Sequence, residues 1–281
     1  MKKNARKESV MAKDYSYRGD NIFFKHELSR NLPKDAYSMH SHNMYEILYF
    51  VSGDATHVIE DRKYKLKRGD LVIIRPSKYH YIQIDSVCDY ERYDILFSTK
   101  AEKIYSLELL DQLPEIINIE EYSMATEIIK KTDFYYKRFS AESFENILTS
   151  LLNELIYLLS VTPATERTDA PEVTSPTISD ALSYINDNLT TLEGVDEVAR
   201  SCFVSESYLF RLFKKELKQT PAKYITSKKL LLAERLISEG GPPTDVYDKC
   251  GFNDYTTFYR NYCSFFGRPP SGEARSKGAK G

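Results

Sequence analysis

The sequence predicts a two-domain α+β protein, in which a β-rich domain with flanking helices precedes an all-α domain. The chain has 281 residues, enough for two domains that each bury a core. Short runs rich in Tyr, Ile, Val and Phe fill residues 22–97, whereas apolar residues beyond about residue 177 recur at helical spacing. Residues 161–176 hold three prolines and four threonines but almost no large apolar side chain, so we interpret them as a linker.

Composition excludes several classes of protein. No run approaches the ~20 apolar residues of a membrane-spanning helix. The first thirteen residues are basic but lack the apolar stretch of a secretory signal, so we expect a cytoplasmic protein with no membrane partner. We also expect no cofactor. The cysteines form no CxxC pair and have no histidine at zinc-ligand spacing, so we interpret them as buried thiols: Cys88, Cys202, Cys250 and Cys263.

The first domain is predicted over residues 21–160, after a flexible basic arm at residues 1–20. Its first part, about 21–98, reads as seven or eight short strands. Strands of this length at regular spacing predict a small closed or sandwiched sheet, since closure removes exposed strand edges. Turn signals separate the strands at residues 52–54, 60–61 and 68–70.

Residues 101–160 change to helical spacing and carry a broad apolar stripe. Part of this stripe is predicted to cover the sheet, and a stripe so rich in leucine could also pair with its copy in a homodimer. Its members are Phe144, Ile147, Leu148, Leu151, Leu155, Leu158 and Leu159.

The second domain is predicted over residues 177–275, with a flexible tail at 276–281. Cap and glycine signals divide it into about six helices joined by tight turns. The predicted caps are Thr177 with Asp180, Ser205, Thr220 before Pro221, Thr244 and Asp254, and the predicted ends are Gly240–Gly241, Gly251 and Gly267.

Basic residues concentrate in this second domain, although the whole chain has a formal net charge of −2. Binding to nucleic acid depends on a local basic face and not on the total charge. From Arg211 to Lys229 there are seven basic residues against one acid, Glu216, a local net of +6. Such a run could also be a solvated helix face, so its neighbours decide the interpretation.

Two segments of this domain share the layout of a helix-turn-helix: VDEVARSCFVSESYLFRLFKKEL (195–217) and TDVYDKCGFNDYTTFYRNYCSFFG (244–267). Joined by a helix containing KLLLAERLI, the pair resembles the DNA-binding domain of the arabinose-regulator (AraC/XylS) family of bacterial transcription factors. The matching residues are Ala199, Ser205, Tyr208, Leu209, Arg211, Phe213, Lys214, Lys215, Leu230, Ala233, Leu236, Gly251, Phe252, Phe258, Arg260, Gly267, Pro270 and Arg275.

The resemblance implies that one helix of each segment enters the major groove of double-stranded DNA. Arg211 and Arg260 are then expected to read guanine, and Phe210 to contact thymine methyl groups. Lys214 and Lys215 are expected to meet phosphates. The tyrosines could instead pack against the neighbouring helix. The residues carried over to the base-facing side are Ser207, Phe210 and Arg211 in the first segment, and Tyr255, Thr256, Tyr259 and Arg260 in the second.

The second segment departs further from the family pattern. Just after the first segment, Lys218 stands where a helix-ending glycine is usual, so that turn must place a non-glycine residue in a strained conformation or be rebuilt. In the second segment, Tyr247 stands where a small alanine is usual. Acids outnumber bases by one between Thr244 and Phe266. We therefore expect the first helix-turn-helix to supply most of the affinity for DNA. Further departures are the shortened GlyGlyProPro connection at 240–243, which loses a buried isoleucine, and Tyr262, Cys263 and Ser264 in place of a phenylalanine and two basic residues.

The first domain carries an HxHxxxE pattern formed by His40, His42 and Glu46, and His80 follows Gly69–Asp70 by ten residues. At strand spacing the three side chains of the pattern point to one face. The set resembles the motif of cupins, small barrels in which three histidines and a carboxylate can hold a metal, and the sensor domain of many regulators of the same family. Such ligands suit iron, manganese, nickel or zinc.

Regulatory domains of this kind often keep the pattern without a metal, and we expect His40, His42, Glu46 and His80 to bind a small-molecule effector. A pocket with aromatic and polar groups suits a sugar or related metabolite. Further predicted lining residues are Met44, Leu48 and Ile82, with Tyr15 and Tyr17 of the arm closing the pocket.

The sequence thus predicts an effector-responsive, sequence-specific transcription regulator that is not an enzyme. Activation is the commoner habit of the family, which implies RNA polymerase as a partner. Because a flexible linker transmits no rigid-body torque, the effector is expected to act through dimer geometry or docking of the arm. The alternatives are a metal-dependent cupin enzyme carrying a helical domain, and a regulator without an effector.

Overall fold

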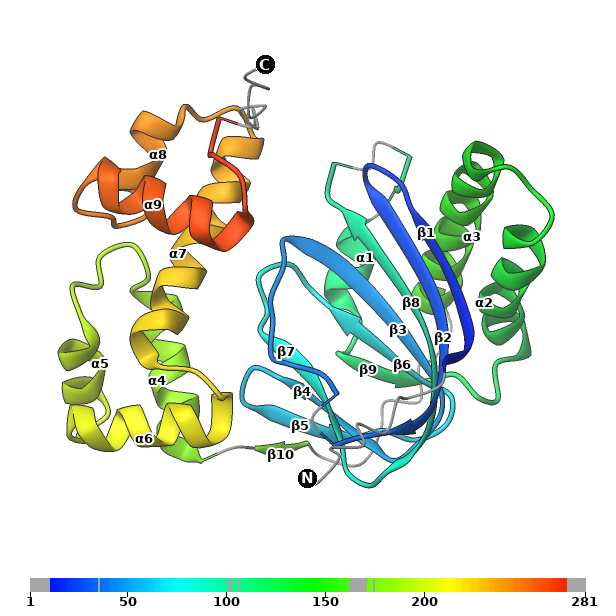
Figure 1. The fold of residues 1–281 in the computed structure, drawn as a ribbon, viewed down its shortest axis with the longest axis horizontal. Helices are drawn as coiled ribbons and strands as arrows, with labels where there is room; N and C mark the ends of the chain where they lie inside the picture. The colour runs from blue at the N-terminus through cyan, green and yellow to red at the C-terminus, as the bar shows by residue number, and fades with distance from the viewer. Residues whose placement is uncertain are drawn as a thin grey trace, which may run out of the picture. The chain divides into compact units, whose positions relative to one another are not determined.

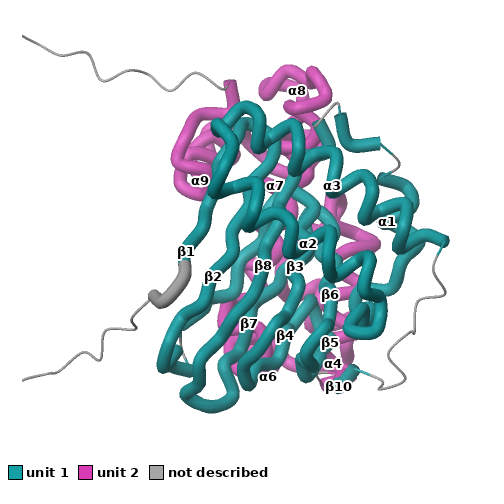
Figure 2. The backbone as a smooth tube through the Cα atoms, turned by 90° about the vertical axis from the view of Figure 1, so that its right-hand side faces the viewer, with its two compact units in different colours: residues 1–172 teal, residues 173–281 magenta. Residues whose placement is uncertain are grey.

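The computed structural model describes residues 11–34, 36–100, 103–105, 107–161, 171–173 and 175–271. The chain divides into an amino-terminal domain, residues 1–172, and a carboxy-terminal domain, residues 173–281, coloured separately in Figure 2. Most of the predicted linker, the first ten residues of the arm and the tail lie outside the described residues. Within the described part of the chain, no helix is long and apolar enough to cross a membrane.

The amino-terminal domain contains two antiparallel sheets (Figure 1). The strand count between residues 22 and 98 and all three predicted turns are confirmed. The larger sheet has the order β1 (Met11–Arg18), β2 (Ile22–Leu32), β8 (Cys88–Ser98), β3 (Met44–Ser52), β6 (Asp70–Ile74) and β9 (Ile116–Asn118). The smaller sheet contains β5 (Arg62–Lys65), β4 (Ala55–Ile59) and β7 (His80–Ile84), and the two-residue β10 (Glu172–Val173) lies at the domain boundary.

Apolar side chains fill the space between the two sheets, so the arrangement is sandwiched. Leu48 and Val72 from the larger sheet meet Ile59, Ile82 and Ile84 from the smaller one. Successive side chains of a strand point to opposite faces of its sheet, so every second side chain points into this space. The predicted inward positions Leu48 and Ile82 are confirmed.

The outer face of the larger sheet is covered by helices (Figure 1), namely α1 (Leu107–Gln112), α2 (Ser123–Tyr136) and α3 (Ala141–Val161). Phe24, Ile47 and Ile95 of the sheet pack against Phe144 and Leu148 of α3. The predicted stripe thus covers the sheet. Its residues Phe144, Leu148, Leu151, Leu155 and Leu159 are buried, and Ile147 and Leu158 are partly buried.

Two expectations for this domain are wrong. Residues 11–18 of the predicted arm form β1, in register with β2. Tyr15 stacks on Tyr136 and Tyr17 meets Phe144 edge-on, so both belong to the core beneath the helices and do not close the ligand pocket. The stretch 101–160 is not wholly helical either, because Ile116–Asn118 pairs with β6 as an edge strand. Both segments gain ladder hydrogen bonds that local periodicity does not reveal.

The carboxy-terminal domain has six helices among its described residues, as predicted: α4 (Pro176–Asp187), α5 (Val195–Ser201), α6 (Glu206–Leu217), α7 (Pro221–Ser238), α8 (Pro243–Lys249) and α9 (Tyr255–Phe266). The side chains of Ser205, Thr220 and Asp254 accept backbone hydrogen bonds as caps, which is confirmed.

Two predicted caps are wrong, and prolines explain both. Helix α4 begins at Pro176, capped by Ser175 and not by Thr177. Helix α8 begins at Pro243, before Thr244. Proline suits the first helical position, because its fixed φ matches the helix and its missing N–H is not needed there.

Candidate nucleic-acid interface and ligand site

Helix α6 presents a largely polar face to solvent because most of its apolar residues face the domain core. Leu209, Leu212, Phe213 and Leu217 are buried. The five residues predicted to meet DNA from this helix all lie on its exposed side: Ser207, Phe210, Arg211, Lys214 and Lys215. These side chains therefore lie on a helix and are open to solvent, which is what an element that reads a DNA groove requires.

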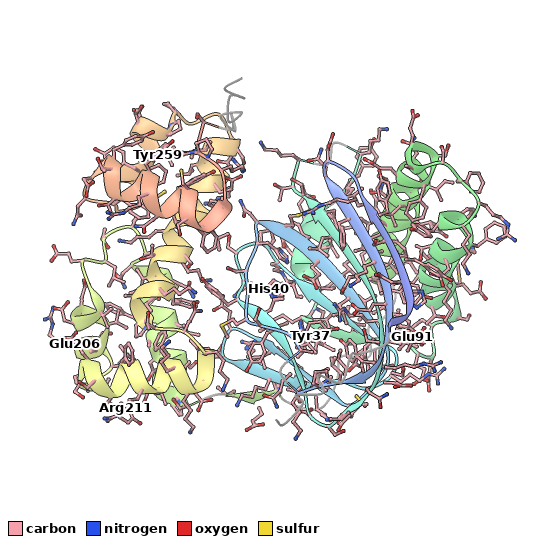
Figure 3. All side chains as sticks on the ribbon, in the orientation of Figure 1. Tyr37, His40, Glu91, Glu206, Arg211 and Tyr259 are labelled. Atoms are coloured by element: carbon pink, nitrogen blue, oxygen red, sulfur yellow. The ribbon has the colours of Figure 1, made fainter. Side chains whose placement is uncertain are left out.

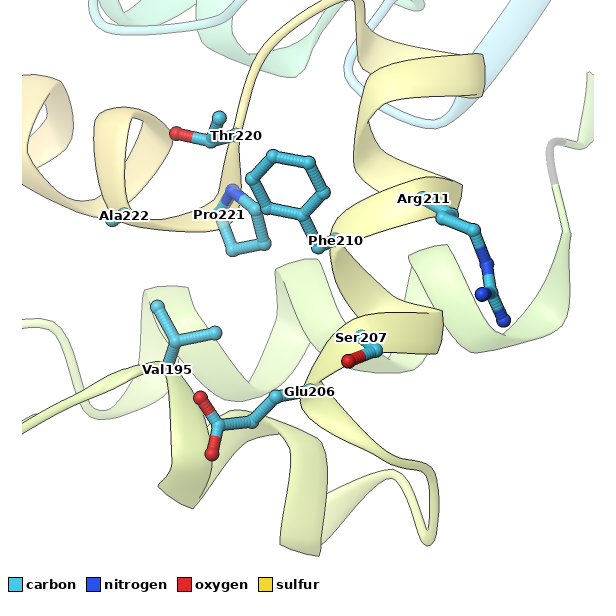
Figure 4. A pocket seen from close by; sticks show the side chains of 8 residues that line it. All are labelled: Val195, Glu206, Ser207, Phe210, Arg211, Thr220, Pro221 and Ala222. Atoms are coloured by element: carbon cyan, nitrogen blue, oxygen red, sulfur yellow. The ribbon is translucent and has the colours of Figure 1, made fainter.

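A hollow of about 510 Å³ adjoins this face (Figure 4). Phe210 lies beside Pro221 on one side of it, while the Arg211 side chain extends away from them. Glu206 also lines the hollow, near Val195 in Figure 4, and sequence reasoning missed it. The helical spacing of the sequence could have identified Glu206, since it stands one turn before Phe210 on the same helix. A carboxylate at this place can accept a hydrogen bond from a cytosine amino group.

Helix α9 presents a smaller polar face. Phe258 and Tyr262 are buried, whereas the predicted residues Tyr255, Thr256, Tyr259 and Arg260 are exposed. Tyr255 also contacts the rings of Tyr247 and Phe258, so its ring belongs in part to an aromatic cluster. The alternative interpretation, in which the tyrosines pack against the neighbouring helix, therefore holds for Tyr255. Arg211, Glu206 and Tyr259 are labelled in Figure 3.

The aromatic cluster explains how this helix-turn-helix tolerates its departures from the family pattern. Tyr247, in place of a small residue, packs edge-on against Tyr255. Val246, 1% exposed, fills the core next to it. Tyr262 is fully buried, and its hydroxyl donates to Glu234, which also pairs with Arg268. Aromatic packing thus supports the second helix-turn-helix.

The basic face next to α6 is smaller than the sequence predicts. Lys228 and Lys229 are buried, each 7% exposed, because they lie on the core side of α7. The Lys228 ammonium lies 5.4 Å from the centre of the Tyr224 ring. The exposed basic residues are Arg211, Lys214, Lys215, Lys218 and Lys223. Five of the seven counted bases therefore remain available for phosphates.

In the amino-terminal domain, His40, His42, Glu46 and His80 come together as predicted. One ligand atom from each lies within 4.8 Å of the others. Backbone bonds between His40 and His80 join the loop before β3 to the start of β7, and Glu46 comes from β3. His40, labelled in Figure 3, is exposed, whereas Glu46 and His80 are buried. The cluster therefore extends from the surface into the sandwich.

The histidine rings are oriented by backbone carbonyls. Nδ1 lies 3.0 Å from the Ser38 oxygen in His40, 3.1 Å from the Met44 oxygen in His42 and 3.0 Å from the Lys78 oxygen in His80. A carbonyl only accepts, so each Nδ1 carries the hydrogen. In the neutral ring Nε2 then bears a lone pair. Nε2 of His42 and of His80 lie 2.9 Å and 3.2 Å from Glu46 Oε2.

These contacts govern the charges of the site. Burial would raise the pKa of the Glu46 carboxyl, but the hydrogen bond to His42 and the nearby His80 imidazole outweigh it and hold that pKa well below its usual value. Burial would lower the pKa of His80, but Glu46 raises it overall. The two shifts favour the ionised form of Glu46 and strengthen the binding of a proton by His80.

The residues present also fit a metal ion. Protonated Nδ1 atoms fixed by backbone carbonyls are the arrangement that prepares Nε2 for coordination. Nε2 of His80 has no well-aligned hydrogen-bond partner among the described residues, although Glu46 is close. Three imidazoles and one carboxylate form a donor set for a first-row divalent metal.

The structure adds buried polar residues that sequence reasoning missed. His57 on β4 is 1% exposed, and neither of its ring nitrogens has a hydrogen-bond partner in the described part of the chain. Burial and the neighbouring His80 lower the pKa of His57 to about 3, which keeps the ring neutral. A single histidine within an apolar strand offers no sequence signal of its own.

Arg92 forms a second buried polar group. Its guanidinium donates to Asp94 at 2.5 Å and to the Tyr37 hydroxyl at 2.5 Å, and lies 3.4 Å from Glu27. Burial raises the pKa of Asp94 to about 6, with Arg92 acting in the opposite direction. Tyr37, labelled in Figure 3, belongs to the loop that carries His40, so Arg92 helps to hold that loop.

Comparison with known proteins assigns each domain separately. A model described as an AraC-like ligand binding domain matches residues 28–120, and a helix-turn-helix domain model matches residues 198–276. The raffinose operon transcriptional regulatory protein RafR of Pediococcus pentosaceus is 25% identical over 273 residues, covering 94% of this chain and 90% of RafR.

Two further relatives also span most of the chain. The HTH-type transcriptional activator RhaR of Escherichia coli O139:H28 is 22% identical over 251 residues, covering 85% of this chain and 87% of RhaR. The uncharacterized HTH-type transcriptional regulator YfiF of Bacillus subtilis is 25% identical over 242 residues, covering 83% of this chain and 77% of YfiF. Both domains are therefore shared with these relatives in the same order.

Proposed function

This chain belongs to the AraC family of DNA-binding transcription regulators, and from that premise we propose how its two domains work. Helices α6 and α9 read DNA in the major groove, with α6 supplying most of the affinity. An effector bound at His40, His42, Glu46 and His80 alters that binding. The observation that supports this most is the exposed face of α6, where Arg211, Phe210 and Glu206 line one hollow and Lys214 and Lys215 are exposed on the same helix.

Sorting the α6 residues by chemistry assigns them roles. Arg211 can bind guanine through two hydrogen bonds, Glu206 can accept from cytosine, and Phe210 can contact a thymine methyl group. Lys214 and Lys215 lie further along the helix and meet phosphates, which position the protein without reading sequence. Mapping of bound genomic sites would test this function: a shared sequence motif at promoters is expected, and binding without any motif would contradict it.

The effector that fits this site is a hydroxyl-rich molecule such as a sugar. Glu46 and Asp94 offer carboxylate acceptors, while His57 can donate or accept within the same domain. The relationship to a regulator named for a raffinose operon favours the same class. Calorimetric titration with a panel of sugars is expected to show binding that His80→Gln weakens. Unaltered affinity in that variant would contradict the assignment.

A metal is the second candidate for the same four residues, favoured by the fixed Nδ1 atoms and the poorly satisfied Nε2 of His80. His40, His42, Glu46 and His80 would hold it, and the ion would supply a positive charge that attracts oxygen atoms of an effector. Metal analysis of purified protein distinguishes the candidates. Stoichiometric metal that is lost in His42→Ala supports the ion, and metal-free protein that still binds effector contradicts it.

Activation is the proposed outcome of DNA binding, supported by the relative named as a transcriptional activator, and it requires contact with RNA polymerase. The protein then acts in the cytoplasm, where its DNA lies.

A homodimer is proposed through the helical layer, whose exposed apolar residues include Phe134, Phe139 and Tyr157. Sedimentation equilibrium is expected to give twice the chain mass, and a monomer at micromolar concentration would contradict the dimer.

A further inference from the structure

Lys229 lies in the middle of α7, the helix that packs against α6 as well as α8 and α9. Its side chain is 7% exposed, whereas lysines are almost never this buried unless paired. Nζ donates to the carbonyl oxygen of Leu192 at 3.0 Å and to that of Gly251 at 2.8 Å. The first acceptor lies in the loop that leads into α5, and the second in the turn between α8 and α9. One ammonium therefore ties together both helix-turn-helix units.

The two tied segments are also in close backbone contact. A Cβ atom on Gly251 would lie 2.3 Å from the Thr190 carbonyl oxygen, so only glycine allows this approach. Beside the contact is a hollow of about 430 Å³, lined by Val195 of the first unit and Phe252 of the second. Side chains do not fill the space between the units there. The polar tie thus lies beside a gap in the side-chain packing between the two units.

The two hydrogen bonds of Lys229 restrict the relative positions of the joined segments more than an apolar contact would. Apolar burial is non-directional, so packed surfaces can slide at small cost. Charge-assisted hydrogen bonds are short and directional, and two of them from one nitrogen fix the positions of two carbonyls relative to each other. Leu192 is three residues before α5, and Gly251 is four residues before α9. Holding these two points limits movement of one recognition helix against the other.

We propose that Lys229 is a positioning residue that sets the separation and rotation of α6 relative to α9, and thereby the spacing of the two DNA segments that the protein accepts. This role rests on the proposed reading of DNA by both helices. One inserted base pair moves the second segment by about 3.4 Å along the duplex and about 34° around it. A fixed pair of helices cannot follow that change, whereas a loosened pair can.

The test uses duplexes selected by the full-length wild-type protein from random-sequence DNA, with the two contacted segments located by footprinting. Each duplex is also made with one base pair inserted between the segments, and with the first segment alone. The wild-type protein is expected to bind the inserted duplex about tenfold more weakly than the parent. In Lys229→Met the difference is expected to shrink to about threefold or less, with unchanged affinity for the single segment.

Two variants control for other effects of the substitution. Lys229→Arg keeps several N–H donors and is expected to retain the spacing preference. Lys228→Met removes an equally buried ammonium that lies over Tyr224, and it is expected to retain the preference too. Thermal unfolding of each variant is measured in parallel.

Three results would overturn the proposal. Full spacing discrimination in Lys229→Met would show that the tie does not set the geometry. Equal losses on the parent and single-segment duplexes, with lowered thermal stability, would show a role in folding alone. Equal binding of wild-type protein to every spacing, with no effect of Arg260→Ala, would contradict the reading of DNA by both helices, and the role of Lys229 would fall with it.

Discussion

The two helix-turn-helix units follow the same backbone path with different residues. Each needs a left-handed residue in its turn and another after its recognition helix. The first unit places Phe203 and Lys218 there, both at φ 55°, whereas the second places Gly251 at φ 74° and Gly267 at φ 70°. Of the two outcomes expected at Lys218, the strained left-handed conformation is the one observed. The fold dictates the conformation even where the residue is unsuited to it.

The two units therefore differ both in the strain of their backbones and in the charge of their exposed faces. The first unit has strained backbone positions but an exposed basic face, and Phe203 is 96% exposed, so packing does not explain its presence. The second unit has relaxed glycines and an aromatic core but only Lys249 and Arg260 as exposed bases between residues 244 and 266. Under the proposed ranking, affinity for DNA and local backbone stability are carried by different units.

The largest effect is expected from Gly251→Ala. The new methyl group would clash with the Thr190 oxygen at a left-handed position, so we expect the free energy of unfolding to fall by about 3 kcal/mol. Gly267→Ala is the matched control, since no heavy atom of the described residues lies within 4 Å of its Cβ position. It should cost only about 1 kcal/mol. Urea denaturation measures both, and equal losses would show that the close contact at Gly251 is not rigid.

The opposite change in the first unit should stabilise the protein. Phe203→Gly removes a strained φ and a side chain that is exposed to solvent, so the free energy of unfolding should rise by about 1 kcal/mol. Lys218→Gly should gain less, because Lys218 Nζ donates to the Lys215 carbonyl oxygen and that bond would be lost. Destabilisation by Phe203→Gly, measured by the same urea titration, would mean that the phenyl ring has a contact partner.

The smallest effect is expected in the salt dependence of DNA binding. Lys214→Ala should reduce the slope of log affinity against log salt by about 0.9, because one phosphate contact is lost. Lys249→Ala, in the second unit, should leave the slope nearly unchanged. Titrations between low and moderate salt measure both slopes. A larger change for Lys249→Ala would reverse the proposed ranking of the two units.

Local signals sufficed wherever structure depends on neighbours along the chain. Ser205, Thr220 and Asp254 cap their helices because each oxygen reaches an amide three residues on, a relation visible in sequence. The HxHxxxE pattern likewise brought His42 and Glu46 together, whereas His80 was expected from the resemblance to the cupin motif.

Long-range packing determined what the sequence could not show. Lys228 and Lys229 count as basic residues in any local tally, yet their side of α7 faces the core. Tyr15 and Tyr17 join the core because β1 pairs with β2, and Arg92 is buried by partners 55 and 65 residues away, Tyr37 and Glu27. Such partners are set by the tertiary fold and leave no periodic signal.

The unequal contribution of the two units is tested most directly by measuring the affinity of a bound promoter fragment for Arg211→Ala and Arg260→Ala separately. Both arginines are exposed on recognition helices, so neither change should unfold the protein. Arg211→Ala is expected to cost about 2 kcal/mol, and Arg260→Ala clearly less. Equal losses, or a larger loss for Arg260→Ala, would contradict the account.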